Sequence, residues 1–115
     1  MTGYDLALFA ARTADAKKGS EIVIYDLHGI SDVTDYFVLV TADSKLQARA
    51  IIGSIEKDLK DRGVRKLGQE GSPQSQWMLL DYSDVVIHVF SPELREYYSL
   101  ETLWGDAPTV EWNAT

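Results

Sequence analysis

The run Asp35–Thr41 limits what this chain can fold into more than any other segment. Its sequence, D-Y-F-V-L-V-T, is rich in β-branched and aromatic residues, and apolar side chains fall on both faces of the extended strand that it predicts. Glu21–Leu27, E-I-V-I-Y-D-L, has the same character. Strands that are apolar on both faces belong in a sheet that is covered, at least in part, on both sides. We therefore expect packed chain above and below this sheet.

Helical periodicity marks two further segments. In Asp5–Lys18 the apolar positions fall on one face, and Gly19 follows as a C-terminal stop. The residues of that face are Leu6, Phe9, Ala10 and Thr13. A second helix is expected to begin after Ser44, which forms a capping-box pattern with Gln47, and to end at Gly63. Its apolar stripe comprises Ala48, Ile51, Ile52, Ile55 and Leu59.

Two strand-like runs, Gln76–Asp81 and Val85–Phe90, predict a β-hairpin. If Asp81 pairs with Asp84, alternation places one mainly apolar face toward the core. That face holds Gln76, Met78, Leu80, Val85, Ile87 and Val89. The other face is mixed, with Trp77 beside His88 and Leu79 beside Val86.

The mixed face of the hairpin has two interpretations. It is a recognition surface built on Trp77 and His88, or Trp77 packs beneath a helix and His88 makes one buried hydrogen bond. A one-residue change of register would exchange the two faces.

Ser91-Pro92 predicts the start of a last helix that runs to about Trp104. Its apolar residues cover more than one helical face, so some of them are exposed at a partner or homodimer contact, or the helix breaks near Ser99. Val64–Leu67 is interpreted as a short strand and Gln69–Gln76 as a loop.

The order of these elements predicts an α/β domain with a single mixed sheet of about five strands and helices packed on it. The length of 115 residues fits one domain. We expect this domain to cover residues 1–107 and residues 108–115 to form a C-terminal tail.

Composition argues against several classes of function. Cysteine is absent and there are two histidines, so thiolate chemistry is excluded, and no metal site or cofactor is expected. The net charge of −7 disfavours direct binding of nucleic acid and suits a basic protein partner. No signal peptide or membrane span is visible, which predicts a cytoplasmic protein.

Carboxylate pairs such as Asp32 with Asp35, and Asp81 with Asp84, lie at turns, where Asp commonly bonds the local backbone. No phosphate-binding glycine loop and no nucleophile elbow is present. We therefore expect a binding protein and not an enzyme.

Four motifs in order resemble the bacterial ribosomal silencing factor family, also called Iojap-like. They are Thr34–Val38, which is similar to its T-D-x-x-V strand, Glu70-Gly71, the block Trp77–Phe90 with its W-x-x-x-D-x-x-D-x-x-x-H pattern, and Arg95–Trp104 with R-x-x-Y-x-L-E-x-L-W. A Tyr at position 36, where some relatives carry Cys, is a mild departure.

The resemblance implies a nucleotidyltransferase-like fold without transferase chemistry, and repression of translation when nutrients are short. It implies binding to the large ribosomal subunit through a basic ribosomal protein, number fourteen in the usual list, so that the small subunit cannot join. Members often crystallise as dimers, which leaves a homodimer open. The partner-binding residues expected are Trp77, Leu79, Asp81, His88, Arg95, Tyr98, Glu101 and Trp104.

Two other functions stay open from the sequence. One is a nucleotidyltransferase-like enzyme, for which carboxylates are present but the required Gly-Ser phosphate loop is not. The other is an assembly chaperone that binds a free ribosomal protein and not finished subunits.

Overall fold

The computed structural model describes residues 1–98 and 106–113, with only the backbone of Pro73 and Tyr98. In chain order the elements are α1 (Gly3–Ala16), β1 (Ser20–Asp26), β2 (Tyr36–Thr41), α2 (Lys45–Asp61), β3 (Gly68–Ser72), the 3-10 helix η1 (Pro73–Ser75), β4 (Trp77–Asp81), β5 (Val85–Phe90) and α3 (Pro92–Tyr98). The part of the last helix expected beyond Tyr98, including Glu101 and Trp104, lies outside the described residues.

The expected single mixed sheet is confirmed. Five strands lie in the order β1-β2-β5-β4-β3, with β2 and β5 parallel and the other neighbours antiparallel. Strand β5 therefore lies in the middle, and all six of its residues are buried. The two runs predicted from their apolar character, β1 and β2, pair with each other within one residue of the expected bounds.

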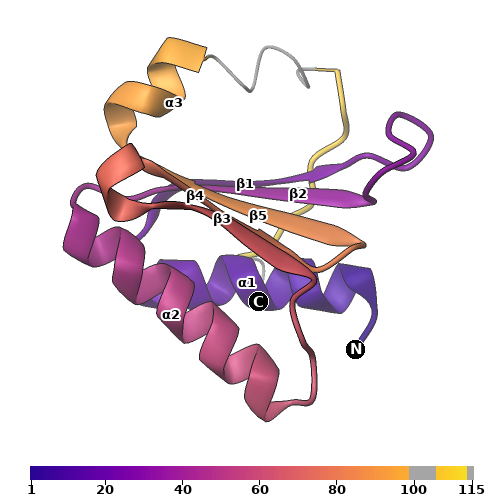
Figure 1. The fold of residues 1–115 in the computed structure, drawn as a ribbon. Helices are drawn as coiled ribbons and strands as arrows, with labels where there is room; N and C mark the ends of the chain where they lie inside the picture. The colour runs from indigo at the N-terminus through magenta and orange to yellow at the C-terminus, as the bar shows by residue number, and fades with distance from the viewer. Residues whose placement is uncertain (99–105, 114–115) are drawn as a thin grey trace.

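Helices α1 and α2 cover one face of the sheet, and α3 lies over the other (Figure 1). The Thr2 side chain caps α1 in a capping box with Asp5, so this helix begins and ends two residues earlier than expected. Ser44 caps α2 as predicted, and the buried residues of that helix all come from the predicted stripe. They pack with alternate residues of the strands into the larger core cluster.

The opposite face carries a second, smaller core cluster. Its buried members are Tyr25, Leu27, Leu39, Phe90 and Ala107. Partly buried Val23, Phe37, Trp77 and Leu94 pack against them. Strands β1 and β2 are thus covered on both sides, as their apolar character predicts.

Strand β3 corrects two predictions. The segment expected to be a short strand, Val64–Leu67, is not one, and the strand is Gly68–Ser72, all but the first residue of which was interpreted as a loop. Its sequence is G-Q-E-G-S, which has no apolar alternation. An edge strand that faces solvent needs only backbone hydrogen bonds to its neighbour, here β4, so its side chains do not reveal it.

The β4–β5 hairpin has the predicted faces but a different register. Asp81 pairs with Val86 and Leu79 with His88, where the expected partners were Asp84 and Val86. The pairing is displaced by two residues, and a displacement of two keeps every side chain on its own face. Trp77, Leu79 and His88 therefore share one face, as predicted.

Residues 106–113 lie along the edge of the sheet. The Asp26 N–H donates to the Pro108 carbonyl at 2.8 Å, and the Val110 N–H donates to the Ile24 carbonyl at 2.9 Å, so the segment pairs with the outer edge of β1. The Trp112 indole N–H donates to the Ile22 carbonyl at 3.0 Å. This segment protects an edge that would otherwise be open to another chain.

Candidate functional site

The face of the sheet opposite α1 and α2 is only partly covered. Along β4 the burial alternates: Met78 and Leu80 are buried in the larger core, whereas Trp77, Leu79 and Asp81 are partly exposed on the other side. Helix α3 reaches this face through Leu94. The surface over β3 and β4 is left partly open.

Two shallow depressions mark this open surface. One, of about 510 Å³, is lined by Ser31, Val33, Thr34, Phe37, Gly68, Gln69, Glu70, Leu79, Asp81, Val86 and His88. The other, of about 260 Å³, is lined by Glu70, Gly71, Ser75, Trp77, Leu79 and Leu94. They share Glu70 and Leu79 and therefore lie side by side, and we call the two together the sheet-face groove. Its centre is apolar, and Glu70 and Asp81 add negative charge.

Four aromatic rings lie beneath and beside this groove. His88 and Phe90 stack nearly parallel with centroids 5.6 Å apart, and Phe37 meets His88 edge-on at 4.8 Å. The Trp77 ring lies 5.0 Å from that of Phe90. Aromatic neighbours at these distances hold one another in place, so the cluster gives the groove a rigid base.

A hydrogen bond joins Trp77 to His88. The Trp77 Nε1–H donates to His88 Nδ1 at 3.2 Å, and an indole can only donate, so the proton of the neutral imidazole lies on Nε2. Burial lowers the pKa of His88 to about 4. The ring therefore stays neutral near pH 7 and keeps accepting from Trp77. Within the described residues, Nε2 has no hydrogen-bond partner.

The connection between β3 and β4 depends on Gly71. Its φ is +79°, and a Cβ added there would lie 2.0 Å from the Trp77 carbonyl oxygen. That oxygen also accepts a hydrogen bond from the Ser75 hydroxyl at 2.9 Å. Gly71 thus lets β3 approach the backbone of Trp77 more closely than a residue with a side chain would allow.

The predicted site residues separate into three groups. Trp77, Leu79 and Asp81 line the groove and are partly exposed. His88 also borders the groove but is only 6% exposed, so it acts mainly as a support. The Tyr98 side chain, Glu101 and Trp104 lie outside the described residues.

Arg95, which was predicted to bind a partner, is 4% exposed. Its Nη1 donates to the Thr41 hydroxyl at 2.9 Å, and its Nε lies 3.7 Å from a carboxylate oxygen of Glu21. These bonds fasten α3 to the ends of β1 and β2. The arginine therefore has a structural role: it sets the position of α3 beside the groove.

Sequence reasoning missed several residues of the groove. Phe37, Glu70, Gly71 and Leu94 line it but were not among the predicted contacts. Val33 lies at its border and is 85% exposed, which is unusual for an apolar side chain. Its position among the polar residues of Ser31–Asp35 was the available clue.

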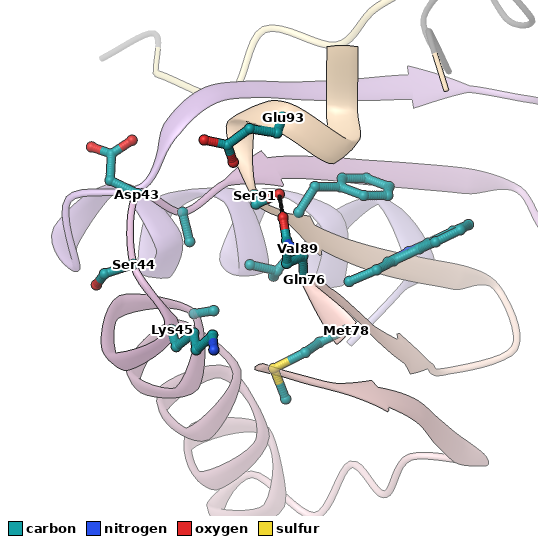
Figure 2. Close-up of a pocket in the computed structure, with 12 residues that line it drawn as sticks. Asp43, Ser44, Lys45, Gln76, Met78, Val89, Ser91 and Glu93 are labelled. Carbon is teal, nitrogen blue, oxygen red and sulfur yellow. Dashed lines mark hydrogen bonds between the residues drawn. The ribbon is translucent and has the colours of Figure 1, made fainter. Parts of the chain in front are cut away.

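A separate pocket of about 430 Å³ lies at the carboxyl ends of β2 and β5 (Figure 2). Met78, Val89 and Phe90 contribute apolar surface, and Trp77 also lines it. The starts of α2 and α3 border it with Asp43, Ser44, Lys45, Ser91 and Glu93, and Ala42, Ala48 and Gln76 complete the lining. We call it the strand-end pocket. Trp77 borders both this pocket and the sheet-face groove.

Neither concavity holds an arrangement suited to metal chemistry. Over residues 1–98 and 106–113, no three His, Asp or Glu side chains gather as a metal site would require. In the same ranges no helix has both the length and the apolar character to cross a membrane. What the geometry offers is a contoured apolar surface with acidic residues, which is suited to binding another macromolecule.

Comparison with known proteins gives consistent results. A family model described as ribosomal silencing factor during starvation matches residues 2–115. Proteins named ribosomal silencing factor from Halalkalibacterium halodurans and Bacillus subtilis are each 40% identical over 96% of this chain, and the matches cover 95% and 94% of those proteins. A crystal structure of a Chromobacterium violaceum protein has a TM-score of 0.87 at 30% identity, covering 100% of this chain and 95% of that one.

Proposed function

The chain belongs to the ribosomal silencing factor family, and from this premise we propose that it represses translation by binding the large ribosomal subunit. In this proposal it contacts a basic ribosomal protein, number fourteen, at the face where the subunits meet. The bound protein then occupies space that the small subunit needs, so the subunits do not join. The repression takes place in the cytoplasm and requires no cofactor.

The sheet-face groove is the observation that carries the proposal. Its apolar centre includes Leu79 and Val86, and its acidic residues are Glu70 and Asp81. Apolar centres with charged borders are typical of protein interfaces, and a net charge of −7 favours encounter with a basic partner. The same charge opposes direct contact with ribosomal RNA.

Trp77 is the residue most suited to anchor the partner. It is partly exposed, its ring is held by His88 and Phe90, and it lies where the groove meets the strand-end pocket. A large aromatic side chain whose orientation is already fixed loses little conformational freedom on binding, and such residues dominate interface energies. Asp81 supports the same surface by meeting basic side chains. Tyr98, Glu101 and Trp104 remain predicted contacts.

The direct test is co-sedimentation of the protein with purified large subunits. Trp77→Glu should weaken binding at least about tenfold, because it removes the anchor and places a charge where the groove meets the strand-end pocket. Tyr4→Glu is the matched control: Tyr4 is an exposed aromatic residue on α1, which covers the other face of the sheet. Circular dichroism should show that both variants are folded.

Two results would contradict the proposal in different ways. Absence of binding by the intact protein would exclude the ribosomal function. Equal binding by folded Trp77→Glu and by the control would move the interface away from the groove. A parallel assay of subunit joining should show fewer assembled ribosomes with the intact protein. Binding to the free ribosomal protein but not to subunits would instead favour an assembly chaperone.

A further inference from the structure

The strand-end pocket has the shape and lining for a long side chain. Its accessible apolar surface comes mainly from the partly exposed Trp77 and Ala48, while Met78 and Phe90 also line it but are almost wholly buried. Its volume of about 430 Å³ is many times the roughly 30 Å³ of a water molecule. An extended hydrocarbon stem would therefore find an apolar surface along its length.

The charged groups of the pocket are unbalanced. Asp43 and Glu93 each bring an exposed carboxylate, and Lys45 brings the one ammonium group of the lining. Figure 2 draws the two carboxylates at the starts of α2 and α3, away from the apolar side chain of Met78. Among the ion pairs of the described residues, none involves these three side chains. The pocket thus presents a net negative charge beside an apolar surface.

The helix starts themselves are already satisfied by their own residues. The Gln47 N–H donates to the Ser44 hydroxyl at 3.0 Å, and the Leu94 N–H donates to the Ser91 hydroxyl at 3.1 Å. These caps remove donors that an anion would otherwise need. Together with the excess of carboxylates, they favour a cationic occupant over a phosphate or a carboxylate.

We propose that the strand-end pocket receives an arginine or lysine side chain of the same basic protein that docks on the sheet-face groove. Its stem lies against Trp77 and Ala48, and its charged head lies between Asp43 and Glu93. Arginine fits best, because a guanidinium group pairs with carboxylates and also stacks on aromatic rings such as Trp77. The identity of the partner rests on the proposed function, whereas the preference for a cation rests on the pocket alone.

Trp77 explains how one partner would reach both concavities. The residue lines the groove on one side and the pocket on the other. A partner seated over Trp77 therefore has side chains near the pocket without any movement of the sheet. The docking surface in this view continues from the groove round Trp77 to the starts of α2 and α3.

The test compares two double variants with the same change of net charge. Asp43→Asn with Glu93→Gln neutralises the pocket, and Asp15→Asn with Glu111→Gln neutralises exposed carboxylates that border neither the groove nor the pocket. Binding to large subunits should weaken about fivefold in the first and change less than twofold in the second. The first variant should also show a smaller decline of affinity with added salt. Equal affinities for both would overturn the proposal.

A second measurement separates this proposal from the function on which it rests. A blocked hexa-arginine peptide is titrated into the free protein and followed by NMR. The largest shifts should occur at the Trp77 indole N–H and at the amides of Lys45 and Glu93, and they should disappear in the Asp43→Asn, Glu93→Gln variant. Hexa-glutamate should cause none. If these shifts occur but the protein does not bind subunits, the cation site in the pocket is supported and the ribosomal function is refuted. If the shifts do not occur, the proposed cation site is refuted.

Discussion

The two faces of the sheet are made by the same strands but are used differently. On the face under α1 and α2, alternate residues such as Leu80 and Ile87 are completely buried in one continuous core. On the other face, Leu79 and Trp77 are left partly exposed, because α3 and the segment at Ala107 cover only part of it. The contrast shows that neighbouring residues of one strand can have different roles: those on the closed face stabilise the fold, and those on the open face are available for binding. Substitutions on the closed face should therefore lower the free energy of unfolding, whereas substitutions on the open face should mainly weaken binding.

The largest effect is expected from a pair of adjacent leucines. Leu80→Ala should lower the free energy of unfolding by about 3 kcal/mol, because it leaves a cavity in the core. Leu79→Ala should lower it by less than about 1 kcal/mol and yet weaken binding to large subunits. Urea unfolding measures the first quantity and co-sedimentation the second. Equal losses of stability would show that the open face is as much a part of the core as the closed one.

A smaller effect is expected from the glycine that holds the edge of the open face. Gly71→Ala should cost about 2 kcal/mol, since the new Cβ would collide with the Trp77 carbonyl and the positive φ disfavours alanine. Gly68→Ala, in the same strand, is the control, because its Cβ would meet no atom within 4 Å. Thermal unfolding of the two variants makes the comparison. A Gly68→Ala variant as unstable as Gly71→Ala would refute the steric explanation.

The smallest effect concerns the buried histidine of the open face. The folded pKa of His88, about 4, lies below the ordinary value of 6.5, so the unfolded chain binds more protons between these pH values. The stability that neutral His88 contributes is therefore present above pH 6.5 and is lost as the pH falls toward 4. Between pH 7 and pH 5.5 the loss should be about 1 kcal/mol.

His88→Gln isolates this contribution, because glutamine does not titrate while the other ionisable groups remain. Chemical unfolding of both proteins across this pH range gives the difference directly. Since protonation of Nδ1 also removes the acceptor of the Trp77 indole N–H, the fluorescence of Trp77 should change in the same pH range. An identical pH profile of stability for the two proteins would show that folding does not lower the pKa of His88.

Much of the fold could be predicted because its elements carry strong local patterns. The buried residues of α2 all come from the stripe that helical spacing predicts, and Ser44 caps it as expected. The faces of the hairpin were predicted even though the register was not, because alternation fixes the face and the turn fixes the partner. Strand β3 was missed, since Gly68–Ser72 is held by backbone bonds that side chains do not encode.

The candidate site was predicted less completely. Trp77, Leu79 and Asp81 were expected at a contact surface and line the groove. Arg95 was expected there too, but it is buried against Thr41, which is distant in sequence. No local pattern distinguishes an arginine that meets a partner from one that meets a residue of its own chain.

By itself, the sequence determined the class of the fold, the lack of cysteine chemistry, the acidity and the family. These follow from composition, from periods of two or 3.6 residues, and from motifs, all of which are local properties. Only the tertiary structure decided which aromatic and charged residues are exposed, that residues 106–113 seal the edge of β1, and that Trp77 lies between two concavities. Exposure depends on which distant segments pack over a residue, and that packing is settled only when the whole chain has folded.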